Sequence, residues 1–204
     1  SEMCIRDRDW AGRKEADKNT FIIFATVFVN PTLYKMKLLW LDLNSSYAHS
    51  SLALPALHAQ IADDTSIEWD IVSATINENV GLTVNEVYHR QPDILAATTW
   101  LFNHEQLLHI LSRVKALLPQ CCIVLGGPEY LGDNEYFLHK NPYVSCVFRG
   151  EGEEVFPQWL ACRNEQEKRN TIPGLCYLDS NGQYRDNGIC LLYTSPSPRD
   201  KRQS

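Results

Sequence analysis

The chain has 204 residues, of which 44% are apolar and 22% charged, as is typical of a globular protein with one domain of ordinary size and short extensions. Nineteen Lys and Arg against 25 Asp and Glu give a net charge of −6, which disfavours a nucleic-acid binder held by phosphate neutralisation. No apolar run approaches the roughly 18 residues that cross a bilayer, and the seven cysteines are too irregularly spaced for a disulfide scaffold.

Both ends of the chain differ from its middle. Ser1–Arg8 resembles the translation of a transposon-type sequencing adapter, and the stretch from Cys190 resembles the same element read on the opposite strand. We therefore expect residues 1–35 to be a non-native or upstream-translated leader and residues 190–204 an adapter-like tail. The alternatives are a secretory signal around the apolar run Phe21–Val29, although no small-x-small cleavage site follows it, and a disordered C-terminal tail rich in Ser and Pro.

The middle of the chain, residues 36–189, is more acidic than the whole. It carries 10 basic and 19 acidic side chains, a net charge of −9, which strengthens the case against nucleic acid. Its cysteines form neither CxxC nor CxxxCxxC, so no local set of zinc or iron–sulfur ligands is present. We expect them to be small buried residues in a reducing cytoplasm. They are Cys121, Cys122, Cys146, Cys162 and Cys176.

From Met36 onward, short apolar runs alternate with amphipathic segments. The alternation predicts an α/β fold, with a five-stranded parallel sheet covered by helices on both faces. Pro55 and Pro157 fit only within the first turn of their helices. The expected strands are 37–43, 67–71, 93–98, 121–125 and 143–148. The expected helices begin near Ser51–Leu54, span 83–91, follow a capping Asn103, span 133–139 and follow the Gly150 loop.

The last part of this region has a different pattern. Residues 175–178 and 183–185 flank Asp179-Ser-Asn-Gly, which predicts a β-hairpin with Asn181 and Gly182 supplying positive φ angles. We expect this hairpin to be an appendage that leads toward a following domain. The predicted organisation is therefore an α/β domain at 36–163 and a hairpin or linker at 164–189.

Four loops are candidates for chemistry, because ligands of open parallel sheets bind beyond the carboxyl ends of the strands. These loops are residues 44–50, 98–103, 126–130 and 149–153. They are rich in Gly, Ser, Thr and aromatic residues, which suits a large flat ligand held by backbone groups, small hydroxyls and rings.

Simpler explanations exist for individual residues of these loops. Gly126 and Gly127, taken alone, are explained by a strand that ends where no side chain fits. The three glutamates within residues 151–154 are candidate acids, but acids in the first turn of a helix usually complement its dipole. His49 stands alone, and no Ser/His/Asp or Cys/His set is evident, so no catalytic residue is predicted.

Several of these segments together carry a family resemblance. They are Gly126-Gly-Pro-Glu after the fourth strand, Val147-Phe-Arg-Gly-Glu-Gly-Glu after the fifth, Ile172-Pro-Gly-Leu-Cys-Tyr and the first loop within Leu41–Ala53. They resemble the N-terminal cobalamin (vitamin B12)-binding domain of radical S-adenosylmethionine enzymes. The resemblance covers nearly all of residues 36–187.

This resemblance implies a flavodoxin-like fold with cobalamin as cofactor. The corrin ring would lie over the loops after strands one, three and four, and the dimethylbenzimidazole tail would enter near Gly126 and Gly127, where absent side chains leave room. Thr98 and Thr99 would direct a hydroxyl toward that tail. The cofactor-binding residues expected on this basis are Asn44, Ser45, Ser46, His49, Thr98, Thr99, Trp100, Leu101, Gly126, Gly127, Pro128, Glu129, Gly150, Glu151, Gly152 and Glu153.

Two departures from related patterns qualify the resemblance. The Asp-x-His-x-x-Gly motif that places a histidine on cobalt is missing, since Asp42 and His49 are seven residues apart, so we expect a base-off cofactor without an axial histidine. The CxxxCxxC motif of the radical domain does not occur in the chain. The resemblance therefore implies a truncated enzyme whose missing domain, a partner in cis, would hold the iron–sulfur cluster and S-adenosylmethionine and perform methyl transfer or related radical chemistry. The fragment alone would be inactive.

Two other functions are consistent with the same pattern. A flavodoxin-like docking or scaffold domain without cofactor would have bulky side chains filling the space beside Gly127. A nucleotide or glycosyl transferase using Glu151 or Glu153 would need a phosphate-binding nest at a helix N-terminus, and no strong sequence mark of one is present.

Overall fold

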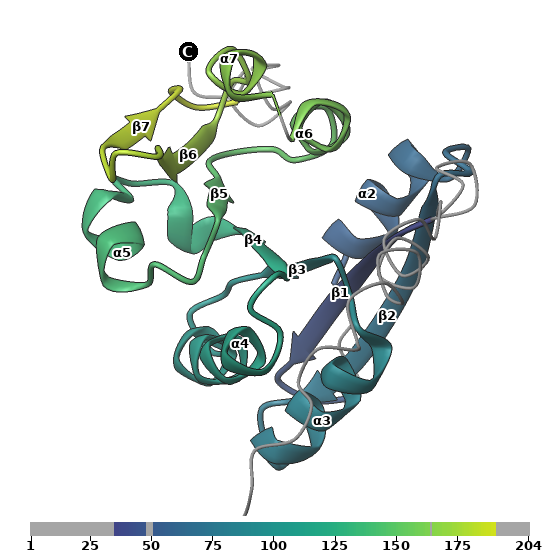
Figure 1. Cartoon of the computed structure of the whole chain (residues 1–204). Helices are drawn as coiled ribbons and strands as arrows, with labels where there is room; N and C mark the ends of the chain where they lie inside the picture. Colours follow the sequence, from purple (N-terminus) through teal and green to yellow (C-terminus); the bar gives the residue numbers. More distant parts are fainter. Residues whose placement is uncertain (1–34, 48–50, 164, 191–204) are drawn as a thin grey trace, which may run out of the picture. The chain divides into compact units, whose positions relative to one another are not determined.

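The computed structural model describes residues 35–47, 51–163 and 165–190 (Figure 1). Residues 1–34 of the predicted leader, and the predicted tail beyond Cys190, lie outside these residues. The strands are β1 (Met36–Asn44), β2 (Ile67–Thr75), β3 (Ile94–Thr98), β4 (Cys122–Gly126), β5 (Cys146–Phe148), β6 (Leu175–Leu178) and β7 (Tyr184–Asp186). The helices are α2 (Ala53–Ile61), α3 (Val80–Arg90), α4 (His104–Leu117), the 3-10 turn η1 (Pro128–Tyr130), α5 (Glu135–Lys140), α6 (Val155–Cys162) and α7 (Gln166–Arg169).

The described strands form one sheet in the order β2-β1-β3-β4-β5-β6-β7. The first five are parallel, with Leu38 opposite Ile94 and Ile94 opposite Cys122. β2 pairs with one side of β1, and β3, β4 and β5 follow in turn on its other side, which is the flavodoxin-like order. The predicted α/β fold with five parallel strands is therefore confirmed.

The hairpin exists, but it is not an appendage. β6 pairs antiparallel with β5, with Val147 opposite Cys176, and β7 continues the sheet beyond it. Leu175, Cys176 and Tyr177 have no exposed surface. The prediction of an appendage was wrong because this short apolar run supplies core residues and covers the open edge of β5.

Helices cover both faces of the sheet (Figure 1). One core lies beneath α3, α4 and α5 and uses strand residues such as Leu39 and Leu41. The other lies beneath α2 and α6 and uses the alternate residues, such as Leu38 and Trp40. This division follows from the two-residue period of a strand, which turns successive side chains to opposite faces.

Two helix starts differ from expectation. α3 begins at Val80, three residues early, because the Asn79 side chain accepts a hydrogen bond from the backbone N–H of Gly81 at 2.8 Å. α2 follows Leu52, and no side chain caps it, so the predicted serine cap is absent. Pro55 and Pro157 lie within the first turns of α2 and α6, as predicted.

The hairpin turn uses different chemistry from the one predicted. Gly182 has a φ of 75°, whereas Asn181 is not in the left-handed region. The Asp179 carboxylate instead accepts hydrogen bonds from the backbone N–H groups of Asn181 and Gln183 at 2.9 and 3.0 Å. A side-chain acceptor thus fixes the turn where two left-handed residues were expected.

The five cysteines of the middle region are free thiols, and all are buried except Cys122, which is half-buried. Burial raises the pKa of Cys121 to about 12, so this thiol stays protonated and unreactive at neutral pH. In the part of the chain that the structure describes, no three His, Cys, Asp or Glu side chains gather as metal ligands. No described helix is both long and apolar enough to cross a membrane.

Candidate functional site

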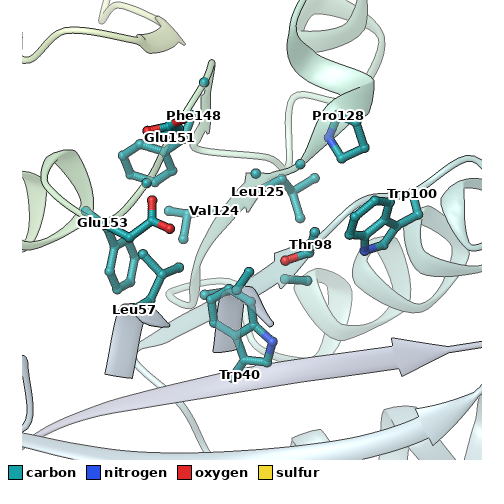
Figure 2. A pocket seen from close by; sticks show the side chains of 18 of the residues that line it. Trp40, Leu57, Thr98, Trp100, Val124, Leu125, Pro128, Phe148, Glu151 and Glu153 are labelled. Carbon is teal, nitrogen blue, oxygen red and sulfur yellow. The ribbon is translucent and has the colours of Figure 1, made fainter. Parts of the chain in front are cut away.

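A cavity of about 390 Å³ lies at the carboxyl ends of the parallel strands, with residues of both α2 and α6 in its walls. Figure 2 shows Trp40, Thr98 and Glu153, from three different segments, around the same open space. The volume is within the range of small-molecule sites. The lining strand residues are Trp40, Ala96, Ala97, Thr98, Val124, Leu125, Gly126 and Phe148. The lining helix and loop residues are Ala53, Leu57, Trp100, Gly127, Pro128, Leu131, Gly150, Glu151, Gly152, Glu153 and Phe156.

Small residues on β3 and β4 create the depth of the cavity. Ala96 and Val124 face the α2–α6 side of the sheet, and by strand alternation so does Gly126. A methyl group added to Gly126 would have only the Cβ of Phe148 within 4 Å, at 4.0 Å. The missing side chain of Gly126 therefore adjoins open space, as the resemblance implied.

Gly127 has a different role from its neighbour. Its φ is 117°, and an added Cβ would lie 2.4 Å from the carbonyl oxygen of Thr99. The loops after β3 and β4 meet here, with the N–H of Thr99 donating to the carbonyl of Gly126 at 2.7 Å. Glycine is required at position 127 by its positive φ and by the close approach of the Thr99 backbone. It is not required to deepen the cavity.

The two threonines after β3 point to different places. Thr98 lines the cavity. Thr99 is fully buried, and its hydroxyl is 3.0 Å from the hydroxyl of Tyr130, which belongs to the opposite core. Only the Thr98 side chain is therefore placed to meet a ligand in the cavity.

Asn103 organises the loop that carries Trp100. Its side-chain amide donates to the carbonyls of Leu43 at 2.9 Å and Thr98 at 3.2 Å, and its Oδ1 accepts from the N–H of Trp100 at 2.8 Å. Asn103 precedes α4 as predicted, but its side chain makes no helix-capping hydrogen bond. It ties the ends of β1 and β3 together instead. Trp100 is 41% exposed at the cavity, while Leu101 is exposed and does not line it.

The loop after β5 forms another wall. Gly150 has a φ of 106° and pairs with Cys190, which approaches so closely that an added Cβ would clash with its carbonyl. Glu151, Gly152 and Glu153 line the cavity (Figure 2). α6 begins at Val155, and Glu154 is the residue at its N-cap, so the helix-dipole explanation fits Glu154 better than Glu151 or Glu153.

The remaining predicted residues that the structure describes do not line the cavity. Asn44 donates to the Asp42 carboxylate at 2.7 Å, and Ser45 and Ser46 lie beside it, half-buried. Glu129 is 3.8 Å from Nδ1 of His104. His49 lies outside the described residues. The four loops thus meet at one edge, but the loop after β1 contributes none of its described residues to the cavity wall.

A carboxylate links the loops after β1 and β2. Oε1 of Glu78 accepts from the Tyr47 hydroxyl at 2.9 Å and from the N–H of Thr75 at 2.8 Å. These two hydrogen bonds lower the pKa of Glu78 below its ordinary 4.5, because both favour the charged form.

Sequence reasoning missed the cavity's floor and walls, above all Trp40, Ala96, Leu57 and Phe156. The one available signal was the pair Ala96 and Ala97 in a strand otherwise built from larger residues, since alanine is disfavoured in strands. Trp40 gave no such signal, because an apolar run predicts a buried strand and not which side chains border a space.

An open sheet of parallel strands with a cavity at its carboxyl edge defines a doubly wound α/β ligand-binding domain. A sequence model of the B12-binding domain matches residues 41–160, which is more than half of the chain. The chain therefore belongs to the B12-binding domain family, and its cofactor is cobalamin.

Two curated proteins show which members of this family are similar. The cobalamin-dependent radical SAM methyltransferase TokK of Streptomyces tokunonensis is 31% identical over 86 residues, which are 42% of this chain and 13% of that protein. The 2-(S-pantetheinyl)-carbapenam-3-carboxylate methyltransferase of Streptantibioticus cattleyicolor is 31% identical over 85 residues, 41% of this chain and 12% of that protein. The chain thus matches only a small part of either relative.

A solved structure shares the fold. The cobalamin-dependent S-adenosylmethionine radical enzyme OxsB, solved with aqua-cobalamin and S-adenosylmethionine bound, superposes with a TM-score of 0.65 at 14% identity. The match covers 78% of this chain and 23% of that one. This chain is a cobalamin-binding domain related to radical S-adenosylmethionine methyltransferases.

Proposed function

We propose that this domain holds cobalamin in the base-off form, with the nucleotide tail in the cavity between α2 and α6 and the corrin ring over the loops at its mouth. The single observation that carries the proposal is the open space beside Gly126, which reaches the sheet and is closed by Trp40, Phe148 and Phe156. A scaffold domain without cofactor would have this space filled by large side chains.

The residues present fit a planar heteroaromatic base with an attached sugar. Apolar and aromatic walls suit the ring faces, and the few polar groups, Thr98 and Trp40 among them, suit heteroatoms on its edge. The cavity extends down to the surface of the sheet because the side chains at Ala96 and Gly126 are small or absent. A buried base would lose its contact with water but gain apolar contacts on both faces.

The loops at the mouth are proposed to contact the corrin ring. Trp100 offers a half-exposed aromatic surface there, and Pro128 and Leu131 offer further apolar surface. The 149–153 loop adds the carboxylates of Glu151 and Glu153, which suit the amide side chains of a corrin. Outside the cavity wall, at the periphery of the proposed site, lie Asn44, Ser45, Ser46, Leu101 and Glu129.

In the full-length protein, this domain is proposed to present the cofactor to a radical S-adenosylmethionine domain in cis. One similar protein is a cobalamin-dependent radical SAM methyltransferase, which supports this arrangement. The missing Asp-x-His-x-x-Gly motif favours a cobalt without an axial histidine. Bound cobalamin would supply a cobalt centre able to carry a methyl group. The chain's own residues would bind and orient it, and the free buried thiols suit a cytoplasmic location.

The proposal is tested by titrating the full chain with hydroxocobalamin and recording the absorbance spectrum. We expect saturable binding and the spectral change that accompanies release of the base from cobalt. In Gly126→Leu the added side chain would project into the cavity, so affinity should fall at least about tenfold, as expected when a ligand group meets an occupied site.

Gly132→Leu is the matched control. A Cβ at Gly132 meets nothing within 4 Å, its φ is not positive, and it does not line the cavity. Gly132→Leu should bind as tightly as the unmodified chain. Equal affinity in Gly126→Leu, or no binding by the unmodified chain when circular dichroism shows it folded, would contradict the proposal.

A further inference from the structure

The floor of the cavity contains a hydrogen-bond donor without a partner. Trp40 is 3% exposed and lines the cavity, and its indole Nε1 has no acceptor among the described residues. Figure 2 shows the indole ring rising from β1 at the base of the open space, with its nitrogen on the edge nearer Thr98 in this view. A buried donor left without a partner costs free energy of folding, so native proteins seldom keep one.

Two other tryptophans with a buried Nε1 show that position distinguishes Trp40. Nε1 of Trp69 and Nε1 of Trp159 also lack a partner, but neither residue lines the cavity. Trp69 stacks on Trp40 with ring centroids 5.9 Å apart, a contact that a phenylalanine ring at position 69 would keep. Of these three, only Trp40 lines the cavity.

The cavity offers few other groups that could meet such an acceptor. Its walls are mostly aliphatic and aromatic, and among the described residues that line it the other uncharged side-chain donors are the Thr98 hydroxyl and the Trp100 indole N–H. A heteroaromatic base whose ring nitrogen is not bound to cobalt carries a lone pair that must find a donor in a dry site. A hydrogen bond from the Trp40 indole N–H to this lone pair would satisfy both groups.

We propose that Trp40 is a specificity-determining residue of the cavity, whose Nε1–H donates a hydrogen bond to the free ring nitrogen of the cofactor's nucleotide base. This inference rests on the proposed function, because it requires the base to be off cobalt and in the cavity. It predicts that the domain selects a cofactor by the acceptor on its base as well as by its shape.

The test compares Trp40→Phe with the unmodified full chain, using cobalamin and cobinamide, which lacks the nucleotide. Trp40→Phe removes the N–H and keeps an aromatic ring. Affinity for cobalamin should fall roughly 3- to 10-fold, the usual worth of one hydrogen bond, and affinity for cobinamide should not change. The thermal midpoint without ligand should fall, because the smaller ring leaves space in the core, so the diagnostic result is the difference between the two ligands. A purely structural tryptophan would lower the affinity for both ligands alike.

Trp69→Phe is the control, since it also removes an unpaired N–H and does not line the cavity. It should leave both affinities unchanged. Nitrogen-15 NMR adds a direct signal: the Trp40 indole N–H, assigned by its loss in Trp40→Phe, should exchange with water more slowly once cobalamin is bound and not once cobinamide is bound.

The outcomes separate the two proposals. If the unmodified chain does not bind cobalamin, the proposed function fails. If it binds, but Trp40→Phe binds equally well or the indole N–H exchanges at an unchanged rate, only the role of Trp40 is overturned.

Discussion

At the scale of single residues, two adjacent glycines at the end of β4 serve different purposes. Gly126 keeps a space open, because a side chain there would enter the cavity. Gly127 allows two loops to touch, because its φ of 117° and its contact with the Thr99 carbonyl exclude a Cβ. The dipeptide therefore combines a cavity-forming residue, for which we propose a role in binding, and a residue needed for backbone conformation, and the two look identical in the sequence.

Because of this difference, substitution by alanine should change stability at one position and not at the other. Gly127→Ala should lower the free energy of unfolding by about 1–3 kcal/mol or more, because alanine is strained at that φ and its methyl would meet backbone. Gly126→Ala should leave stability nearly unchanged, because the nearest atom is at ordinary contact distance. Urea denaturation of both variants measures this, and equal losses would show that the two positions are not distinct.

Glu78 makes the junction of the first two loops dependent on pH. Its pKa is lowered by bonds that require the charged carboxylate, so the stabilisation is present above the ordinary pKa of 4.5 and is lost as pH falls through the lower folded-state value. Glu78→Gln keeps an acceptor oxygen but does not titrate.

Thermal midpoints of both proteins from about pH 6 to about pH 3 provide the check. The unmodified chain should be the more stable at pH 6, and its advantage over Glu78→Gln should shrink as the carboxylate becomes protonated. An advantage that stays constant with pH would show that the carboxylate charge contributes nothing to this junction.

At the scale of elements, the site depends on how the ends of β1 and β3 are joined. Asn103 makes three hydrogen bonds there and is 1% exposed. Because these bonds satisfy the carbonyls of Leu43 and Thr98 and the N–H of Trp100, the side chain fixes the loop that borders the cavity. It is a positioning residue, since it does not itself line the cavity.

Asn103→Ala should therefore lower the free energy of unfolding by about 1–3 kcal/mol, since buried polar groups of the backbone lose their partners. It should also weaken cobalamin binding by loosening the Trp100 loop. Asn181→Ala, in an exposed turn, is the control and should affect stability only slightly. Denaturation and absorbance titration measure the two effects, and an Asn103→Ala protein of unchanged stability would contradict this role.

The elements themselves were largely predictable, because each depends on a local pattern. The apolar runs that became β1, β3 and β4 and the stripe of Leu107, Leu111 and Val114 on α4 are signals that a single sequence contains. Termini were less predictable, since capping at Asn79 or its absence near Ser51 depends on competing local hydrogen bonds.

The site was predictable only in part, because its loops are local and its cavity is not. Thr98, Gly126 and the 150–153 loop could be predicted as site residues because they lie at or just after the ends of predicted strands. The floor and walls require knowing which strand neighbours lie side by side, as Trp40 and Ala96 do across β1 and β3. The different roles of Gly126 and Gly127 depend on backbone φ angles, which the residue types alone do not specify.

At the scale of the whole domain, the hairpin is part of the folded unit. Leu175 and Tyr177 belong to the core under α2 and α6, and Cys176 belongs to the opposite core. β6 also pairs with β5, whose edge would otherwise be open to other chains. The 150–153 wall of the cavity is braced from the same region, since Gly150 pairs with Cys190.

A fragment of residues 36–163 should therefore be unstable or aggregate, whereas residues 36–190 should unfold cooperatively. The shorter fragment loses buried side chains from both cores and exposes the β5 edge. Circular dichroism melts and size-exclusion chromatography of the two fragments compare them. A monomeric, cooperatively folded 36–163 fragment would show that the hairpin is dispensable.

The central claim is that the nucleotide tail of cobalamin occupies the cavity between α2 and α6. Competition between cobalamin and cobinamide for the full chain tests it most directly, because the two ligands share the corrin ring and differ in the tail. We predict that cobalamin binds at least about tenfold more tightly and that Gly126→Leu removes most of this preference. Equal affinity of the unmodified chain for the two ligands would show that the tail does not bind in the cavity.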